Sequence, residues 1–400
     1  MRRPDRNVAL NIATGTILAL LLAVTLTPSS STTIDFRSLC LICGERGLAD
    51  TILNIALFMP LGFALGTRIQ SGLRAYVIAV AISTGIEFAQ VFIPGRDSSL
   101  ADIVFNGLGA ALGVGLARSW RLWLLPSPRA ARSLGALAAL GALAVLATTD
   151  LLMRPDFPSM QYDAAWTPRS RNMVHYEGSV LQASVGETAT PNGLLADSET
   201  VREQLLAGEP LHGSIVAGAV PDGTAIVLSI NGFQLEVASL RLHRFDLVFR
   251  YRMRSNALRL DRPQLRIPGA LLEVRPGEII PIGAERRGRG YCMWVGDSRR
   301  CDLGFTLGDG WSLLLWTPNL PVALASLLGL IWLAGLTVPV GYWTPGIRSA
   351  AVGAAAIGLA LALIPGFGYL LTTPWPQFAA AVAGVALGRT LQGLVRRGAG

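Results

Sequence analysis

A single carboxylate, Glu87, lies inside an otherwise apolar stretch of the chain. An ionisable side chain at membrane depth is costly, so it usually faces a bundle interior or a cavity and serves a function. Gln90 follows one helical turn later, Arg96 follows a Pro-Gly pair, and Asp102 and Asn106 come next. Such groups could bind a polar head group, or catalyse a reaction with Glu87 as general acid or base.

The composition fits a membrane protein. Of 400 residues, 51% are hydrophobic and 15% are charged, which is too apolar for an ordinary soluble domain. Residues 150–309 hold 18 arginines and 19 acids, whereas the rest of the chain holds 16 arginines and 7 acids. The net charge of +8 therefore belongs to the apolar part and indicates membrane topology, so we expect no nucleic-acid partner.

Apolar segments long enough to span a bilayer, at about 20 residues each, occur in two groups. They predict a multi-spanning α-helical membrane protein with about eight transmembrane helices, five before residue 149 and three after residue 315. The predicted spans are Val8–Thr27, Asp50–Gly66, Leu73–Ile93, Leu100–Ala117, Ala131–Thr149, Pro318–Val340, Ile347–Ile364 and Phe378–Leu394.

The arginines predict the orientation of these helices. With a cytoplasmic N-terminus, thirteen arginines lie in inner segments and only three in the short outer loops. Both termini are then cytoplasmic, and residues 150–314 lie outside the membrane. The first span could instead be a cleaved signal peptide, but its apolar run is long and no A-x-A site follows, so we favour an uncleaved anchor.

The outer segment, 150–314, has the pattern of an all-β sandwich. Glycine and proline turns recur, with short alternating runs between them. Residues 225–230 and 233–237 flank Asn231-Gly232 and predict a hairpin. Residues 249–254 alternate strictly, with three arginines on one face; we favour a solvated strand face over contact with an acidic polymer or a lipid head group.

The four cysteines all fall on the predicted outer side. Cys292 and Cys301 bracket eight residues, which suits a hairpin closed by a disulfide in an oxidising compartment. Cys40 and Cys43 have metal-ligand spacing but lack a second ligand pair, so a local disulfide or two free thiols is favoured over zinc. We predict no metal site and no cofactor.

The topology gathers the polar residues near the outer surface. Asn54, Glu87, Gln90, Asp102 and Asn106 fall within about two helical turns of that surface, and Arg96 lies in the loop above them. The pairs Glu87/Gln90 and Asp102/Asn106 each share a helix face. Glycines on the second and fourth spans allow close helix approach. The predicted ligand-binding set is Asn54, Glu87, Gln90, Arg96, Asp102 and Asn106, with Glu87 as the candidate catalytic residue.

Structural roles compete with these functional ones. Buried Asn and Gln can bond helices together, Asp102 can cap its own helix, and Arg96 can serve as a partner or an interfacial anchor. Structure and function are balanced for Asn54, Gln90 and Asn106. For Glu87 a function is favoured, because burying a carboxylate is expensive.

Four sequence blocks resemble the VanZ-like family over about residues 8–118. They are N-x-x-L-F-x-P-x-G from Asn54, E-x-x-Q from Glu87, G-R at Arg96 and D-x-x-x-N-x-x-G from Asp102. The resemblance implies a small helical domain of the bacterial plasma membrane, in a family whose namesake is associated with teicoplanin resistance. It implies no established reaction.

The outer segment is similar, more weakly, to laminin-G or concanavalin-like sandwiches that follow the membrane domain in some longer VanZ-like proteins. That resemblance implies a glycan ligand. The predicted domains are therefore a VanZ-like bundle (1–149), an outer sandwich (150–314) and C-terminal helices (315–400).

The leading hypothesis is a non-enzymatic envelope protein. Its bundle would bind a lipid-linked precursor or another cell-wall molecule in an outward-facing polar pocket, and its sandwich would engage cell-wall glycan. The rival is an enzyme acting on a lipid-linked phosphate or peptidoglycan precursor, with Glu87 as acid or base and Arg96 holding the anion. A transporter ranks third, because no polar path continues to the cytoplasmic side.

Overall fold

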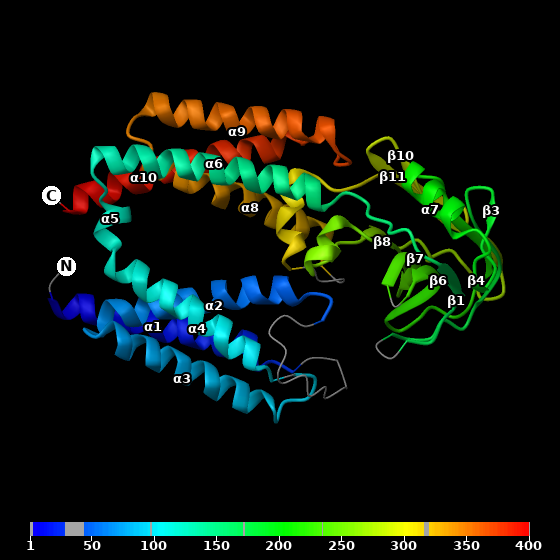
Figure 1. Cartoon of the computed structure of the whole chain (residues 1–400), viewed down its shortest axis with the longest axis horizontal. Helices are drawn as coiled ribbons and strands as arrows, with labels where there is room; N and C mark the ends of the chain where they lie inside the picture. Colours follow the sequence, from blue (N-terminus) through cyan, green and yellow to red (C-terminus); the bar gives the residue numbers. More distant parts are fainter. Residues whose placement is uncertain are drawn as a thin grey trace. The chain divides into compact units, whose positions relative to one another are not determined.

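The computed structural model describes residues 3–28, 44–96, 98–170, 173–233, 235–315 and 320–399 (Figure 1). Contacts between Cα atoms divide the chain into two compact units, Met1–Leu134 with Leu391–Gly400, and Gly135–Thr390. Cys40 and Cys43, for which a local disulfide or two free thiols was predicted, lie outside the described residues.

The first unit is a helical bundle. Serine side chains cap two of its helices: Ser71 accepts a hydrogen bond from the Arg74 backbone, and Ser99 accepts one from the Ala101 backbone. Its helices are α1 (Arg3–Leu26), α2 (Gly47–Arg68), α3 (Gly72–Gln90), α4 (Leu100–Arg118), the short α5 (Trp120–Leu124) and the start of α6 (Pro128–Leu152).

Helices α2 and α4 form the most extensive helix pair in this unit. Glycines make the approach possible: a Cβ atom at Gly109 would overlap the Ile55 carbonyl, and one at Gly113 would overlap the Met59 carbonyl. Gly62 on α2 lies equally close to α4. Phe58 and Leu61 fill the core beside this contact, so the backbones of the two helices are locked in one register.

The third helix ends earlier than its apolar run. The predicted span continues to Ile93, but α3 ends at Gln90, because the backbone amides of Phe92 and Ile93 bond only three residues back. Gly95 then adopts φ +74°, a conformation that glycine reaches without strain, and reverses the chain toward α4.

The second unit joins four helices to a β region. Helix α8 (Val322–Trp343) packs against α10 (Trp375–Ala399) through Gly341 and Gly384, and α9 (Ile347–Phe367) contacts α8. The predicted start of this group at Pro318 lies outside the described residues.

Helix α6 packs within the second unit from Gly135 onward. A Cβ atom at Gly135 would lie 3.3 Å from the Thr344 backbone, and Thr149 lies beside Gly310. The contact-based division therefore falls before the predicted domain boundary at residue 149.

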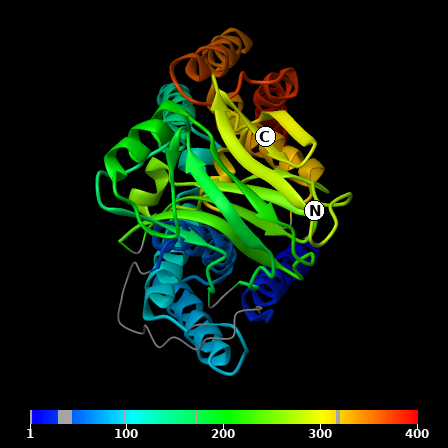
Figure 2. The same cartoon turned by 90° about the vertical axis from the view of Figure 1, so that its right-hand side faces the viewer.

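The β region consists of two antiparallel six-stranded sheets (Figure 2). One sheet has the order β4-β1-β6-β7-β8-β9 and the other β12-β11-β10-β5-β2-β3. Their strands are β1 (Tyr162–Trp166), β2 (Ser179–Val185), β3 (Thr188–Ala189), β4 (Gly193–Leu194), β5 (Leu211–Val216), β6 (Thr224–Gly232), β7 (Leu235–His243), β8 (Asp246–Tyr251), β9 (Leu265–Ile267), β10 (Ile279–Arg287), β11 (Gly290–Val295) and β12 (Ser298–Leu303).

The two sheets share one core. Tyr251 of β8 stacks on Tyr291 of β11 with ring centroids 5.1 Å apart, and apolar residues of both sheets form one buried cluster. The region is thus a sandwich. It also contains a helix, α7 (Ser198–Ala207), which the alternating pattern does not predict.

The predicted hairpin forms with a shifted turn. Strand β6 continues through Asn231 and Gly232, which pair with Glu236 and Leu235 of β7. Phe233, at φ +23°, follows the strand instead of lying within the next one, so Asn231-Gly232 is not the turn.

Of the three arginines predicted to lie on one face of a strand, only Arg250 is in strand β8. Strand β8 ends at Tyr251, so Arg252 follows it, and Arg254 begins a short 3-10 helix. Arg250 and Arg241 lie beside the carboxylate of Glu236. Burial alone raises the pKa of Glu236, but its neighbouring guanidiniums outweigh burial and hold that pKa below the ordinary 4.5.

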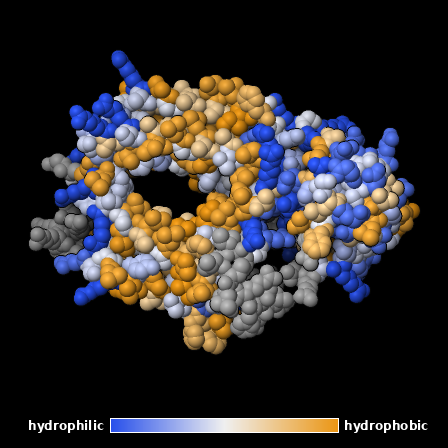
Figure 3. Space-filling model, viewed as in Figure 1, coloured by the Kyte–Doolittle hydropathy of each residue, from blue (hydrophilic) through white to orange (hydrophobic). Residues whose placement is uncertain are grey.

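Seven described helices are long and apolar enough to cross a membrane, and α1 contains a shorter apolar segment, Leu10–Thr25. Figure 3 shows hydrophobic residues over much of the visible helical surface, while hydrophilic residues prevail over the β region (Figure 3). These helices and the two sheets confirm the predicted fold class of a multi-spanning helical membrane protein with a β-sandwich domain.

Substitution of Gly109 tests the packing of α2 on α4. Gly109→Ala places a methyl group against the Ile55 carbonyl, so we expect the free energy of unfolding to fall by about 1–3 kcal/mol in detergent micelles. Gly115→Ala on the same helix is the control, because a Cβ atom there meets nothing within 4 Å. Equal stabilities for the two variants would contradict this packing.

Candidate functional site

The carboxylate of Glu87 joins the end of α3 to the start of α4. Its Oε2 atom accepts a hydrogen bond of 2.9 Å from the Ser99 backbone amide, and the side chain is 4% exposed. Ser99 is also the residue whose hydroxyl caps α4. One residue therefore organises the helix start and binds the buried carboxylate.

A second contact lies one turn deeper, between the same two helices. The Asn106 side-chain amide donates a hydrogen bond of 3.0 Å to the Ser83 hydroxyl, and both residues are buried. Ser83, Glu87 and Gln90 follow at helical spacing and are all buried, so they form one polar stripe on α3.

Asn54 and Asp102 form a pair between α2 and α4. The Asn54 side-chain amide donates a hydrogen bond of 2.8 Å to Oδ1 of Asp102. Asp102 lies in the first turn of α4, where the helix dipole favours a negative charge. This pair links the closely packed helices at their polar end.

Two of the predicted residues contact the end of α1. Arg96 donates through Nε to the Thr27 carbonyl and through Nη2 to the Val24 carbonyl, each at 2.8 Å. Gln90 donates through Nε2 to the Thr25 carbonyl at 2.9 Å. These carbonyls belong to the C-terminal end of α1, where a cation is favourable, so Arg96 caps that helix.

Two acceptor atoms remain without a donor. Oε1 of Gln90 and Oδ1 of Asn106 are buried, and neither has a hydrogen-bond partner among the described residues. Gln90 lies one helical turn after Glu87 on α3, and Asn106 bonds to Ser83, one turn before Glu87. A buried acceptor without a donor is destabilising, so each is a place where a ligand or a water molecule would gain a hydrogen bond.

The six predicted residues thus lie at one end of the bundle, where their hydrogen bonds form three separate groups. Glu87 and Asn106 bond between α3 and α4, Asn54 and Asp102 bond to each other, and Gln90 and Arg96 bond to α1. We call Ser83, Glu87, Gln90, Ser99 and Asn106 the polar layer.

Sequence reasoning missed Ser83 and Ser99. Serine is common in apolar helices and in caps, so neither residue stands out by type. The i, i+4 spacing of Ser83 and Glu87 is the one signal that could have identified Ser83.

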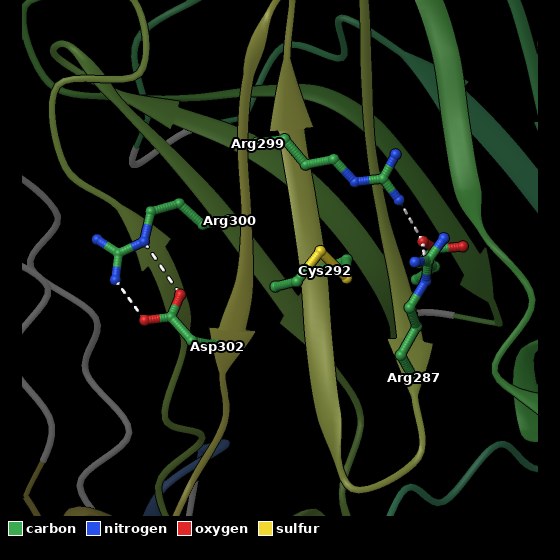
Figure 4. Close-up of a disulfide and its surroundings, with 7 residues drawn as sticks. Arg287, Cys292, Arg299, Arg300 and Asp302 are labelled. Atoms are coloured by element: carbon green, nitrogen blue, oxygen red, sulfur yellow. Dashed lines mark hydrogen bonds and ion pairs between the residues drawn. A yellow bond between two sulfur atoms is a disulfide. The ribbon is translucent and has the colours of Figure 1, made fainter.

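The described residues contain no group of three or more His, Cys, Asp or Glu side chains placed to hold a metal ion. In the β region, a disulfide joins Cys292 of β11 to Cys301 of β12 (Figure 4). Arginines surround it, and Arg299 pairs with Glu285 at 2.7 Å.

The apolar helices define a multi-pass membrane protein embedded in a lipid bilayer. Residues 11–123 match the model of the VanZ/LLP1 family, so the first unit carries a VanZ/LLP1 family domain that contains the whole polar layer. No curated protein and no solved structure matches the chain. The β region has two sheets but no assigned family.

A double-mutant cycle tests the pairing of Asn54 with Asp102. Asn54→Ala and Asp102→Ala should each lower the free energy of unfolding, with a coupling of about 0.6 kcal/mol, the average for hydrogen bonds between membrane helices, and at most about 1.7 kcal/mol. Asn54→Ala combined with Thr84→Ala, at an exposed position of α3, should be additive. A coupling near zero for Asn54 with Asp102 would show that the bond does not join α2 to α4.

Proposed function

We propose that the polar layer binds the hydrogen-bond-donating head group of an amphiphilic molecule, such as a lipid-linked precursor or another cell-wall molecule. The observation that carries this proposal is the pair of buried acceptors without a donor, Gln90 Oε1 and Asn106 Oδ1, on either side of the Glu87 carboxylate. From Ser83 to Gln90 the α3 helix rises by about 10 Å, which is the size of one sugar ring with its substituents.

The chemistry of these atoms selects the ligand. A carboxylate and two amide oxygens present only acceptors, and they favour donors such as sugar hydroxyls or an ammonium group. The same atoms repel phosphate. The part of the ligand that enters the polar layer is therefore a saccharide or an amine, and any phosphate of a lipid-linked molecule stays outside the layer.

Arg96, Asn54 and Asp102 support the site in this proposal without contacting the ligand. The Arg96 guanidinium is bonded to two carbonyls of α1, and Asn54 and Asp102 are bonded to each other. Together they hold α1, α2 and α4 around the α3 stripe. The arginine distribution favours an orientation in which this end of the bundle is on the outer side of the membrane, the side of the cell-wall molecules.

Catalysis by Glu87 is the alternative. In that reaction Glu87 is the general acid or base, and a cation must hold the phosphate of the substrate. Arg96 is the cation assigned to that role from the sequence, and its donors Nε and Nη2 already bond to α1. The contacts therefore favour binding over turnover.

Binding of an undecaprenyl-linked saccharide to the purified protein in nanodiscs tests the proposal. Glu87→Gln should weaken binding by about ten-fold or more, because it removes a hydrogen bond to a charged acceptor. Gln90→Leu, which removes one neutral acceptor, should weaken binding by about two- to ten-fold. Gln70→Leu, an exposed glutamine at the opposite end of the bundle, is the control and should leave the Kd unchanged.

The same preparations separate binding from catalysis. If the wild type converts the probe, and Glu87→Gln abolishes turnover but leaves the Kd within a few fold, the hypothesis of catalysis by Glu87 is correct. Wild-type Kd values for all three variants would refute the polar layer as a binding site.

A second candidate function concerns the β region. A row of residues crosses the β12-β11-β10-β5-β2-β3 sheet in register: Ser184 pairs with His212, His212 with Gly283, and Gly283 with Trp294. The Trp294 ring lies over Gly283, whose missing side chain makes room for it, and Arg299 stacks on the ring at 5.2 Å. An indole beside polar side chains suits a sugar face, so we propose this sheet as the surface for cell-wall glycan.

Retention on purified peptidoglycan sacculi tests this surface. Trp294→Ala should weaken retention by about two- to ten-fold, because stacking on the indole is lost. Arg300→Ala, on the same disulfide-closed hairpin, is the control, because Arg300 is exposed and pairs with Asp302. Equal retention of both variants and the wild type would exclude Trp294 from glycan binding.

A further inference from the structure

The opposite end of α4 carries a second, basic site. An open pocket of about 530 Å³ lies where α4 meets α5, lined by Gly115, Arg118, Ser119, Trp120, Arg121 and Leu122. Arg118 lies twelve residues beyond Asn106, which places this pocket about 18 Å along the helix from the polar layer. The pocket is therefore a separate site.

The sequence around this pocket contains basic residues but no acidic ones. Residues 51–86 and 103–149 contain no Asp or Glu, and they contain six arginines. Two of these, Arg118 and Arg121, line the pocket and are exposed. A pocket whose lining holds two guanidiniums and no carboxylate favours an anion.

The arginines are held in place. Arg118 donates to the Ile69 carbonyl at 3.4 Å and to the Gln70 carbonyl, just after the end of α2. The Arg121 guanidinium lies 5.4 Å from the centre of the Trp120 ring. Preorganised cations lose little side-chain freedom on binding a ligand.

The residues around the pocket have the composition of a membrane interface. Helix α5 has the sequence WRLWL, with tryptophans of the kind that gather at the level of lipid head groups, and Leu122 is 72% exposed. Exposed leucines recur on α4 at Leu108, Leu112 and Leu116 and lead along the helix to the pocket. They form an apolar track of the kind an acyl chain follows.

We propose that this pocket binds the phosphate head group of an anionic phospholipid, with the phosphate on Arg118 and Arg121 and an acyl chain along the leucines of α4. The bound lipid would fix α5 and the α2–α3 turn at the membrane surface. The proposal is independent of the polar layer and of its ligand.

Native mass spectrometry of the full-length protein, titrated with phosphatidylglycerol and with phosphatidylcholine, tests this site. Arg121→Gln should weaken phosphatidylglycerol binding by about five-fold and leave phosphatidylcholine binding unchanged, because one cation near anionic lipid is lost. Arg129→Gln is the matched control: it removes the same charge from an exposed position of the next helix that does not line the pocket. Arg118→Gln should act like Arg121→Gln.

Two results would overturn the proposal. Equal losses for Arg121→Gln and Arg129→Gln would show general electrostatic attraction instead of a site. Displacement of phosphatidylglycerol by millimolar inorganic phosphate would assign the pocket to a soluble anion. The melting temperature of each variant, unchanged from the wild type, excludes unfolding as the cause of weaker binding.

Discussion

The close approach of α2 and α4 is the constraint on which the candidate site depends. Gly62, Gly109 and Gly113 leave no room for side chains between the two backbones, so the register of the helices is fixed along their length. At one end of this contact, Asn54 meets Asp102. Helix α3 then packs on α4 with its polar stripe inward, and the buried carboxylate is positioned by backbone geometry instead of by flexible side chains.

The burial of Glu87 is made tolerable by a backbone donor and by a hydrogen bond with the Ser98 side chain. Ser99 supplies that donor and also caps α4, so the carboxylate and the helix start stabilise each other. The neighbouring amides are only half satisfied, because each donates a hydrogen bond while its oxygen accepts none among the described residues. A structural network would be expected to close on itself. These two acceptors are the observation on which the proposed ligand site rests.

The sequence predicted the larger features because each depends on local pattern. Apolar length gives the spans, and helical spacing places Glu87 and Asn106 in one layer. Their partners could not be predicted, because the bonds of Arg96 and Gln90 depend on where α1 ends in space. The prediction of a turn at Asn231-Gly232 was wrong, because pairing with β7 overrides the local preference of Asn-Gly for a turn. The prediction of function rests on the polar layer, and no sequence pattern identifies the ligand of that layer.

A cryo-electron microscopy structure with an undecaprenyl-linked saccharide would show whether the polar layer binds this ligand. We expect density for the saccharide within hydrogen-bond distance of Gln90 Oε1 and Asn106 Oδ1, beside Glu87. Density for ordered water alone at these two atoms, with the saccharide bound elsewhere on the protein, would contradict this expectation.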